Sequence, residues 1–286
     1  MRTTPTAVAL GAGVALLLTG CNATPPQADP TTRPSAAATP ATSATSATSA
    51  TAEQSNPLPT GSQPVQLDPA EFTTEIDHPY WPMKPGTRRT YREVDEEGEI
   101  KEVVVVVTTQ TKKIANGITA RVVRDTVRVE GSIIEDTFDW YAQDAHGNLW
   151  YLGEDTAEFE DGKLTTRDGS FEAGVDGALP GIMIPADPAH GMRYRQEYYA
   201  GEAEDNGEVL STDEMAEVPA GPYRGALLTK DTSTIEPDVQ EYKLYARDVG
   251  PVLVLGVSGG SGREELIKVD QVPPETGTGP LGKPNP

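Results

Sequence analysis

Cysteine, histidine and basic residues are scarce in this 286-residue sequence, which contains one cysteine and three histidines. One cysteine cannot form an intramolecular disulfide or a cysteine-based zinc site, and three histidines leave little material for metal binding. The 23 Lys and Arg residues stand against 44 Asp and Glu residues, which gives a net charge of −21. Nucleic acids and anionic bilayers both bind basic surfaces. We therefore expect no nucleic-acid partner, no metal site and no cofactor.

The hydrophobic run near the amino terminus is too short to cross a membrane. It covers residues 7–18 (AVALGAGVALLL), which are 12 residues that follow Arg2. At 1.5 Å per helical residue the run spans about 18 Å, against roughly 30 Å for the hydrocarbon core of a bilayer. A positive residue followed by a short apolar core is typical of an export signal. We therefore predict an exported protein and no transmembrane helix in this region.

The four residues that begin with the last leucine of this run, Leu18-Thr19-Gly20-Cys21, resemble the lipobox, the processing site of bacterial lipoproteins. The resemblance implies that signal peptidase cleaves between Gly20 and Cys21 and that Cys21 carries a diacylglycerol anchor. Several acyl chains, palmitate among them, give stable attachment where a single chain binds only marginally. We therefore expect a lipoprotein whose membrane partner is reached through Cys21, on the extracytoplasmic face of the cell membrane.

Composition divides the chain into four parts. Residues 1–20 form the predicted lipoprotein signal peptide, and residues 21–69 are rich in Ala, Thr, Ser and Pro. Such a segment cannot bury enough apolar surface to fold, so we predict a disordered tether, whose composition also permits O-glycosylation. Residues 70–272 contain enough Val, Tyr, Leu and Trp for one core and are predicted to form a single extracytoplasmic domain. The Pro- and Gly-rich residues 273–286 are predicted to be a flexible tail.

The predicted domain is all-β, because apolar and polar residues alternate with period two between Gly, Asp, Asn and Pro turn signals. Valines at all positions 103–107 predict a central strand that is covered on both faces. A short helix is predicted at 68–72, and residues 168–191 are predicted to be a loop. The expected strands are 88–94, 100–109, 118–130, 133–143, 149–152, 157–160, 163–166, 192–199, 208–218, 223–231, 239–247, 252–257 and 264–269.

The spacing of these segments decides the predicted architecture. Turn signals recur every 8–13 residues, and no strand–helix–strand pattern is present. This favours a single antiparallel meander of about a dozen strands that curves into a half-barrel, a barrel or a sandwich. A parallel nucleotide-binding sheet is disfavoured for the same reason.

We predict no catalytic residues. Residues 256–260 (GVSGG) match the G-x-S-x-G string of hydrolases, but a strand follows Ser258 where a helix is required. A histidine is also needed later in the chain than the serine, and no histidine lies beyond His190. His78, His146 and His190 sit in turn-like contexts and are expected to be exposed.

Acidic and aromatic clusters are the remaining candidates for a site. Acidic residues gather at 154–161 and 202–205 without the order of a calcium-binding EF-hand loop, which favours a solvated acidic face and leaves Ca²⁺ binding open. The aromatic candidates for ligand binding are Tyr80, Trp81, Trp140 and Trp150. They are explained either by core packing or by a concave site for a hydrophobic ligand or a glycan.

Several motifs in the predicted domain resemble a pattern that recurs in an uncharacterised family of secreted or lipid-anchored β-rich bacterial proteins. The likeness covers about residues 75–270 and implies kinship without an activity. A looser likeness in architecture is to the curved-sheet lipoprotein carriers, which hold helices in the concavity of the sheet. The motifs are 78–82 (HPYWP), 84–87 (KPGT), 139–144 (DWYAQD), 147–156 (GNLWYLGEDT), 171–178 (FEAGVDGA) and 218–223 (VPAGPY).

Taken together, these patterns predict a non-catalytic binding or envelope-structural module rather than an enzyme. The alternative is a carrier or binder of lipid, or of another hydrophobic ligand, in the concavity of a curved sheet. An enzyme that uses acidic residues near 155–161 is a third hypothesis. The identity of the ligand and the oligomeric state stay open at this stage.

Overall fold

The structure is a computed structural model that describes residues 58–283. The predicted signal peptide, Cys21 and the tether up to residue 57 lie outside the described residues. The described part is all-β, with fifteen strands and one short 3₁₀ turn, η1 (Pro69–Glu71). This confirms the predicted fold class. Within residues 58–283 no helix has the length and hydrophobicity needed to span a membrane.

The strands follow the predicted segments closely in most of the domain. They are β1 (Phe72–Thr73), β2 (Thr87–Val94), β3 (Ile100–Lys113), β4 (Thr119–Val129), β5 (Ser132–Asp144), β6 (Leu149–Glu160), β7 (Lys163–Thr166), β8 (Phe171–Glu172), β9 (Gly181–Ile184), β10 (Arg193–Arg195), β11 (Asp205–Val218), β12 (Gly221–Ser233), β13 (Gln240–Ala246), β14 (Gly250–Ser258) and β15 (Arg263–Gln271). The predicted helix at 68–72 is the single turn η1, whose backbone at Ala70 donates to the Asp68 side chain.

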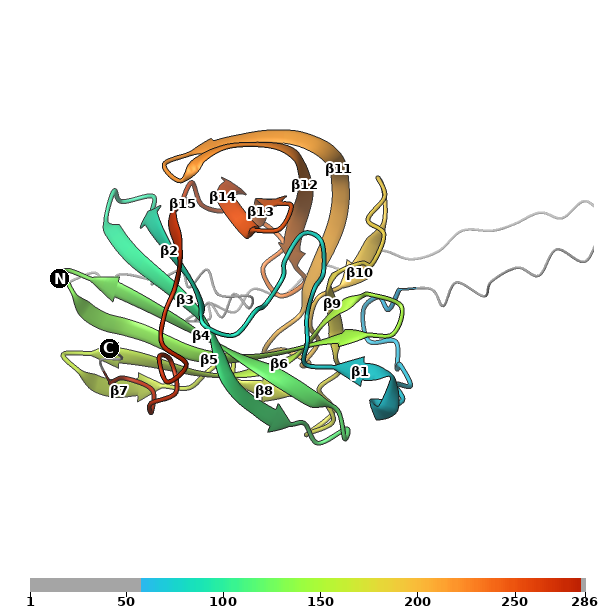
Figure 1. The fold of residues 1–286 in the computed structure, drawn as a ribbon. Coiled ribbons are helices and arrows are strands. Elements are labelled where there is room, and N and C mark those ends of the chain that lie inside the picture. Colours follow the sequence, from blue (N-terminus) through green and yellow to red (C-terminus); the bar gives the residue numbers. More distant parts are fainter. Residues whose placement is uncertain (1–57, 284–286) are drawn as a thin grey trace, which may run out of the picture. The chain divides into compact units, whose positions relative to one another are not determined.

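One antiparallel sheet contains all of these strands (Figure 1). Its main path runs from β10 through β15 to β2 and on to β7, so that almost every strand pairs with its neighbour in sequence. The two halves of this meander join where β15 pairs with β2, with Leu266 opposite Tyr91. The short strands β8 and β9 pair with β6, and β1 pairs with β5. The predicted antiparallel meander is therefore confirmed.

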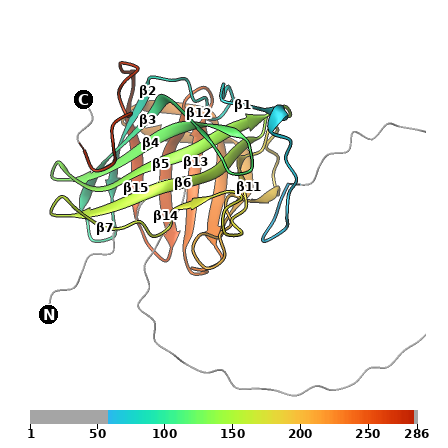
Figure 2. The same cartoon turned by 90° about the horizontal axis from the view of Figure 1, so that it is seen from below.

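The sheet curls until β9, which pairs with β6, lies against β10. In Figure 2, β2–β6 form one wall and β11–β14 cross behind it as a second wall. Leu179, just before β9, forms an isolated antiparallel bridge with Tyr198, and its backbone nitrogen lies 2.8 Å from the Tyr198 oxygen. Gly181 packs so close to Gln196 that an added Cβ would lie 2.0 Å from the Gln196 carbonyl oxygen. The meander thus forms an open, barrel-like sheet whose two sides are linked here by a single bridge.

Gly181→Ala is expected to destabilise the protein by roughly 3 kcal/mol, because the new methyl group displaces the backbone of the junction. Urea unfolding of the full chain measures this loss. Gly260→Ala is the matched control, since an added Cβ there meets no atom within 4 Å. Equal stability of the two variants would contradict the close junction between residues 181 and 196.

Residues 74–86, here called the plug segment, enter one end of the curled sheet. Trp81 connects the two walls, because its ring lies 5.5 Å from the ring of Tyr141 on β5 and 5.8 Å from that of Tyr245 on β13. The backbone oxygen of Pro79 accepts a hydrogen bond from Asp248, in the turn between β13 and β14, at 2.8 Å. The plug segment therefore fills space that an open concavity would leave for a large ligand.

The long hairpin of β11 and β12, which is part of this sheet, folds back over its neighbouring strands. Its pairing contains three register shifts between Val209 and Met215, which bend the hairpin over β13 and β14 (Figure 1). The backbone of Ala220 then donates to the oxygen of Leu266 on β15 at 3.0 Å. A second hydrophobic cluster forms here from Ala216 and Val218 together with Tyr91, Val103 and Leu266.

Three strand predictions need correction, and a close backbone contact explains the largest. Residues 149–152 and 157–160 were expected to be separate strands, but both belong to β6. Gly153 does not break this strand; its φ of +123° and its missing Cβ let the backbone of Phe171 approach it. The predicted loop 168–191 therefore contains β8 and β9, whereas the predicted strand 192–199 keeps regular pairing only in β10.

The ordered domain begins before the predicted boundary at residue 70. Leu58, Val65 and Leu67 pack against the hydrophobic core. Arg195, which is fully buried, donates from its backbone to Pro59 at 2.7 Å and from its guanidinium group to Gln63 at 2.8 Å. The composition of residues 58–69 indicated a disordered tether. Composition does not reveal that the buried Arg195 binds the carbonyl groups of this segment.

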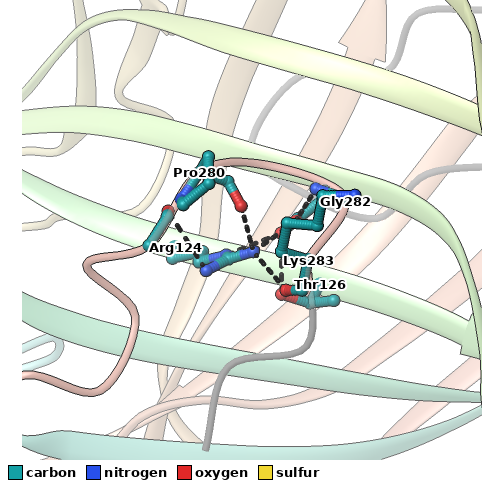
Figure 3. A network of polar contacts seen from close by, with 7 residues as sticks. Arg124, Thr126, Pro280, Gly282 and Lys283 are labelled. Atoms are coloured by element: carbon teal, nitrogen blue, oxygen red, sulfur yellow. Dashed lines mark hydrogen bonds and ion pairs between the residues drawn. The ribbon is translucent and has the colours of Figure 1, made fainter.

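The C-terminal residues 273–283 also pack on the sheet, where the sequence predicted a flexible tail. Figure 3 shows the carbonyl groups of this segment around the Arg124 guanidinium on β4. Arg124 donates to the oxygen of Lys283 at 3.1 Å, and the backbone of Gly282 donates to Asp136 on β5 at 2.7 Å. Arg124 and Asp136 form an ion pair with 1% and 0% exposure. Pro and Gly weaken local structure, but this buried ion pair holds the segment.

Candidate functional site

The interior of the curled sheet contains a cavity of about 40 Å³, which is room for about three water molecules. We call it the interior cavity. Strands from both walls and the plug segment line it with four aromatic side chains, which are Trp81, Tyr91, Tyr141 and Tyr245. Four ionisable side chains complete the polar part of the lining, namely Asp125, Asp139, Lys243 and Glu264.

Strand alternation places the carboxyl groups inside. On β4, Val123, Asp125 and Val127 share the inward face, and each is at most 5% exposed. On β5 the same alternation turns Asp139 and Tyr141 inward, and both line the interior cavity. A charged residue in phase with buried valines is therefore buried with them.

Two carboxyl oxygens of the interior cavity have no hydrogen-bond partner within residues 58–283. They are Oδ1 of Asp125 and Oε2 of Glu264, in residues that are 5% and 4% exposed. Burial raises the pKa of both carboxyl groups well above the ordinary values, and nearby carboxylates such as Asp139 and Glu93 raise it further. An ionised carboxylate in this position is unfavourable unless a cation accompanies it.

Asp139 and Glu154 share the hydroxyl group of Tyr151. The hydroxyl oxygen lies 2.8 Å from Asp139 Oδ1 and 2.8 Å from Glu154 Oε2, and the two acids face each other across β5 and β6. A hydroxyl group has one proton to donate, so both contacts are hydrogen bonds only when one carboxyl group keeps its proton. Burial raises the pKa of both acids, which favours a proton held between them.

Lys243 is the cation of the interior cavity, and its charge is already matched. Its Nζ lies 3.0 Å from Asp231 Oδ2 and 3.6 Å from Glu241 Oε2. Attraction to these two carboxylates raises the pKa of Lys243 well above its ordinary value, although burial opposes this. Lys243 therefore carries its charge. It forms no ion pair with Asp125 or Glu264, although its charge partly offsets the rise in the pKa of Glu264.

Carboxyl groups are also buried beyond the interior cavity. Glu135 on β5 is 6% exposed and lies opposite Glu158 on β6. Burial first, and then the charge of Glu158, raises the pKa of Glu135 to about 8. Glu93 is paired with Lys101 at 3.1 Å, and both are buried. The inside of this acidic protein is thus itself rich in acids.

Of the four aromatic residues predicted for ligand binding, Trp81 lines the interior cavity. Tyr80, its neighbour in the plug segment, is 2% exposed, and the Arg247 guanidinium lies 4.4 Å from its ring centre. Trp140 on β5 points to the other face from Tyr141 and carries Lys112 over its ring at 4.4 Å. Trp150 donates to Asp144 at 2.8 Å and contacts Phe72 edge-on. The four residues do not converge on one site.

The histidines were expected to be exposed, which is wrong for His78. It is 1% exposed; its Nδ1 accepts from the backbone of Tyr80 at 3.2 Å, and its Nε2 lies 3.0 Å from the Pro185 oxygen. Burial lowers its pKa, so the neutral ring fixes the plug segment to the stretch after β9. His146 and His190 are exposed as predicted. Ser258 is exposed at the end of β14 and leads into β15, as the turn interpretation requires.

No group of three or more His, Cys, Asp or Glu side chains suited to a metal ion occurs in the part of the chain that the structure describes. The acidic cluster at 154–161 is divided between environments. Glu154 is buried beside Asp139, whereas Asp155 forms an exposed ion pair with Arg167. The spacing of these acids along the sequence therefore does not produce a common site.

The fold and the site define a class: an all-β protein with one curled antiparallel sheet and an interior that is both aromatic and acidic. No protein-family model matches the chain, and no curated protein matches it. A solved structure of a candidate lipoprotein from Parabacteroides distasonis is 10% identical, covers 67% of this chain and 98% of its own, and gives a TM-score of 0.37. A β-barrel-like protein of the domain of unknown function DUF1849 from Brucella abortus is 14% identical, with coverage of 65% and 98% and a TM-score of 0.32.

Proposed function

We propose that this chain is a lipid-anchored, extracytoplasmic and non-catalytic binding protein, and that the interior cavity is its ligand site. The lipobox-like residues 18–21 support the anchor, which is attached to Cys21. The observation that carries the binding role is the pair of unpartnered carboxyl oxygens on Asp125 and Glu264. Buried polar groups without hydrogen-bond partners lower the stability of the folded state, and they cluster at functional sites.

A small polar ligand fits this site better than an acyl chain. The interior cavity of about 40 Å³ is far below the roughly 300–1,000 Å³ of pockets that hold drug-sized ligands. A lipid tail would also lie against Asp125, Asp139 and Glu264, which offer it no compensation for desolvating their carboxyl groups. Binding of a lipid or a glycan is therefore less favoured at the interior cavity.

The surroundings of the histidines and of Ser258 support a non-catalytic role. Both ring nitrogens of His78 are engaged with backbone groups, so this histidine is not free to exchange protons with a substrate. Ser258 is exposed, at the end of a strand that continues into another strand. The serine of a G-x-S-x-G nucleophile elbow requires a neighbouring base and a helix behind it.

The proposed function is tested with the full chain purified from membranes. Thermal unfolding is measured with palmitate, glucose, acetate and ethylammonium as probes, and native mass spectrometry detects any lipid that co-purifies. We expect at least one small polar probe to raise the melting temperature and palmitate to leave it unchanged. Val105→Phe, which places a ring in the interior cavity, is expected to abolish the effect.

The matched control is Val257→Phe, which makes the same exchange at a position that is 44% exposed on β14. It is expected to respond to the probes as the natural chain does. A co-purifying lipid that Val105→Phe excludes would identify a lipid carrier and overturn the proposal. Failure of every probe to change the melting temperature would leave an envelope-structural module instead.

A further inference from the structure

We infer that the interior cavity selects a small organic ammonium cation. This inference rests on the proposed function, and it adds the chemical class of the ligand. The first observation in its support is the balance of charge among the residues that line the cavity. Asp125, Asp139 and Glu264 line the cavity, and none of the three forms an ion pair with a Lys, Arg or His side chain of residues 58–283.

The single lysine of the lining does not change this balance. Lys243 holds Asp231 and Glu241 at 3.0 and 3.6 Å, and these two carboxylates already exceed its one positive charge. An anionic ligand would therefore enter a site with excess negative charge. A cationic ligand would instead supply a positive charge to pair with the three carboxyl groups.

The free oxygens specify a donor as well as a charge. Asp125 Oδ1 and Glu264 Oε2 are buried and lack hydrogen-bond partners among the described residues, so each accepts a hydrogen bond from a ligand without losing another. An ammonium group carries several N–H donors on one compact charge, which matches two or three separate carboxyl groups. A guanidinium group is planar and forked, which suits a single carboxylate in bidentate contact.

The aromatic walls are suited to the remainder of such a ligand. Trp81 lies between Tyr141 and Tyr245, with ring centres 5.5 and 5.8 Å away, and Tyr91 lines the cavity from β2. The faces of aromatic rings attract cations, and tryptophan attracts them most strongly. The same rings cover the short apolar part of an alkylammonium ion. Carboxyl groups and aromatic side chains thus line one space.

Size and coordination exclude two other cationic ligands. A cavity of about 40 Å³ accommodates a short alkylammonium ion and excludes a long polyamine. A bare divalent ion requires several oxygen ligands around one point. The part of the chain that the structure describes contains no group of three or more side chains arranged for such an ion.

The test is isothermal titration calorimetry of the full chain with ethylammonium chloride at pH 8. Sodium chloride at the same ionic strength corrects for screening, ethanol is the neutral analogue and acetate is the anionic one. We expect ethylammonium to bind, and ethanol and acetate not to. The double variant Asp125→Asn, Glu264→Gln is expected to weaken binding by about tenfold or more, because two charge-assisted hydrogen bonds are lost.

The control removes the same two charges elsewhere, as Asp213→Asn, Glu217→Gln, at exposed positions of β11. It is expected to change the affinity by less than about twofold, since screened surface charges contribute little. The buried variant replaces carboxyl groups that are unfavourably buried, so it is expected to fold, and its melting temperature verifies this.

Three outcomes would overturn the inference. Equal affinity of the double variant and the natural chain for ethylammonium would place the binding elsewhere. Binding of ethanol or acetate in a manner that Val105→Phe abolishes would refute the ammonium class and leave the proposed function intact. Absence of binding by every probe would contradict both.

Discussion

Replacing Glu135 with glutamine is expected to stabilise the protein by about 4 kcal/mol at pH 8 and by only about 1 kcal/mol at pH 5. The pKa of Glu135 is raised from 4.5 to about 8, mainly by burial. The folded state therefore binds this proton more tightly than the unfolded state does. Stability is fully present below the unfolded pKa and is lost as the pH rises toward 8. Glutamine removes this loss because it is neutral at every pH.

Thermal unfolding of the full chain at pH 5 and pH 8 measures the effect, which corresponds to a rise in melting temperature of roughly 10 °C at pH 8. Glu97→Gln, in the exposed turn after β2, is the control and is expected to change little at either pH. A gain for Glu135→Gln of the same size at both pH values would show that burial does not hold the proton on Glu135.

The buried acids of the interior act in the same direction as Glu135. Burial also raises the pKa of Asp125 and Glu264, so the natural chain loses stability as the pH rises above about 5. The ion pairs of Asp270 at the surface affect stability at the opposite end of the pH range. Arg88 and Lys268 hold the pKa of Asp270 at about 2, so its contribution is lost as the pH falls below about 4. The buried acids therefore favour folding at low pH, whereas the charge partners of Asp270 favour folding above about pH 4.

Replacing Asp136 with asparagine is expected to destabilise the protein by about 3–5 kcal/mol. The Arg124 guanidinium is 1% exposed and would remain buried without its carboxylate. Asp136 also accepts hydrogen bonds from Thr126 at 2.8 Å and from the backbone of Gly282 at 2.7 Å. The same substitution is therefore expected to release the C-terminal segment 273–283. Urea unfolding measures the first effect, and limited proteolysis measures the second.

The control for Asp136→Asn is Asp155→Asn, which breaks the exposed ion pair with Arg167. Exposed ion pairs contribute at most about 1 kcal/mol, so this variant is expected to remain nearly as stable as the natural chain. The double variant Arg124→Met, Asp136→Leu is expected to recover most of the stability, because no charge is then buried. Similar losses for Asp136→Asn and Asp155→Asn would refute the role of burial.

Period-two alternation and turn residues predicted the strands of this protein well. Residues 163–166 were predicted as they are found, and 208–218 and 223–231 form the long hairpin of β11 and β12. These signals are local, since each depends on a few neighbouring residues. The prediction was wrong in ending a strand at residue 152, because β6 continues through Gly153, where the missing Cβ permits a close contact with Phe171. Such a contact between distant residues leaves no local signal.

The candidate site was harder to predict because polar residues in strands ordinarily face solvent. One signal was available: Asp125 stands in phase with Val123 and Val127, which predicts a buried carboxyl group when the valines are buried. Among the aromatic candidates, Trp81 was in the predicted set and lines the interior cavity, whereas Tyr245 and Tyr91 were not in it. Their role depends on the curl of the sheet, which brings β2 and β13 to one space.

The sequence by itself determined that the described domain is all-β and antiparallel. The alternation of apolar and polar residues and the choice of turn residues both depend on neighbouring positions in the chain. It also carries the lipobox-like segment on which the proposed anchor rests. Only the tertiary structure decided that a bridge joins residues 179 and 198 across the curled sheet and that residues 273–283 are held by Arg124. It alone brought Asp125, Asp139 and Glu264 together. The curl of the sheet turns these three side chains inward, and burial then raises the pKa of their carboxyl groups.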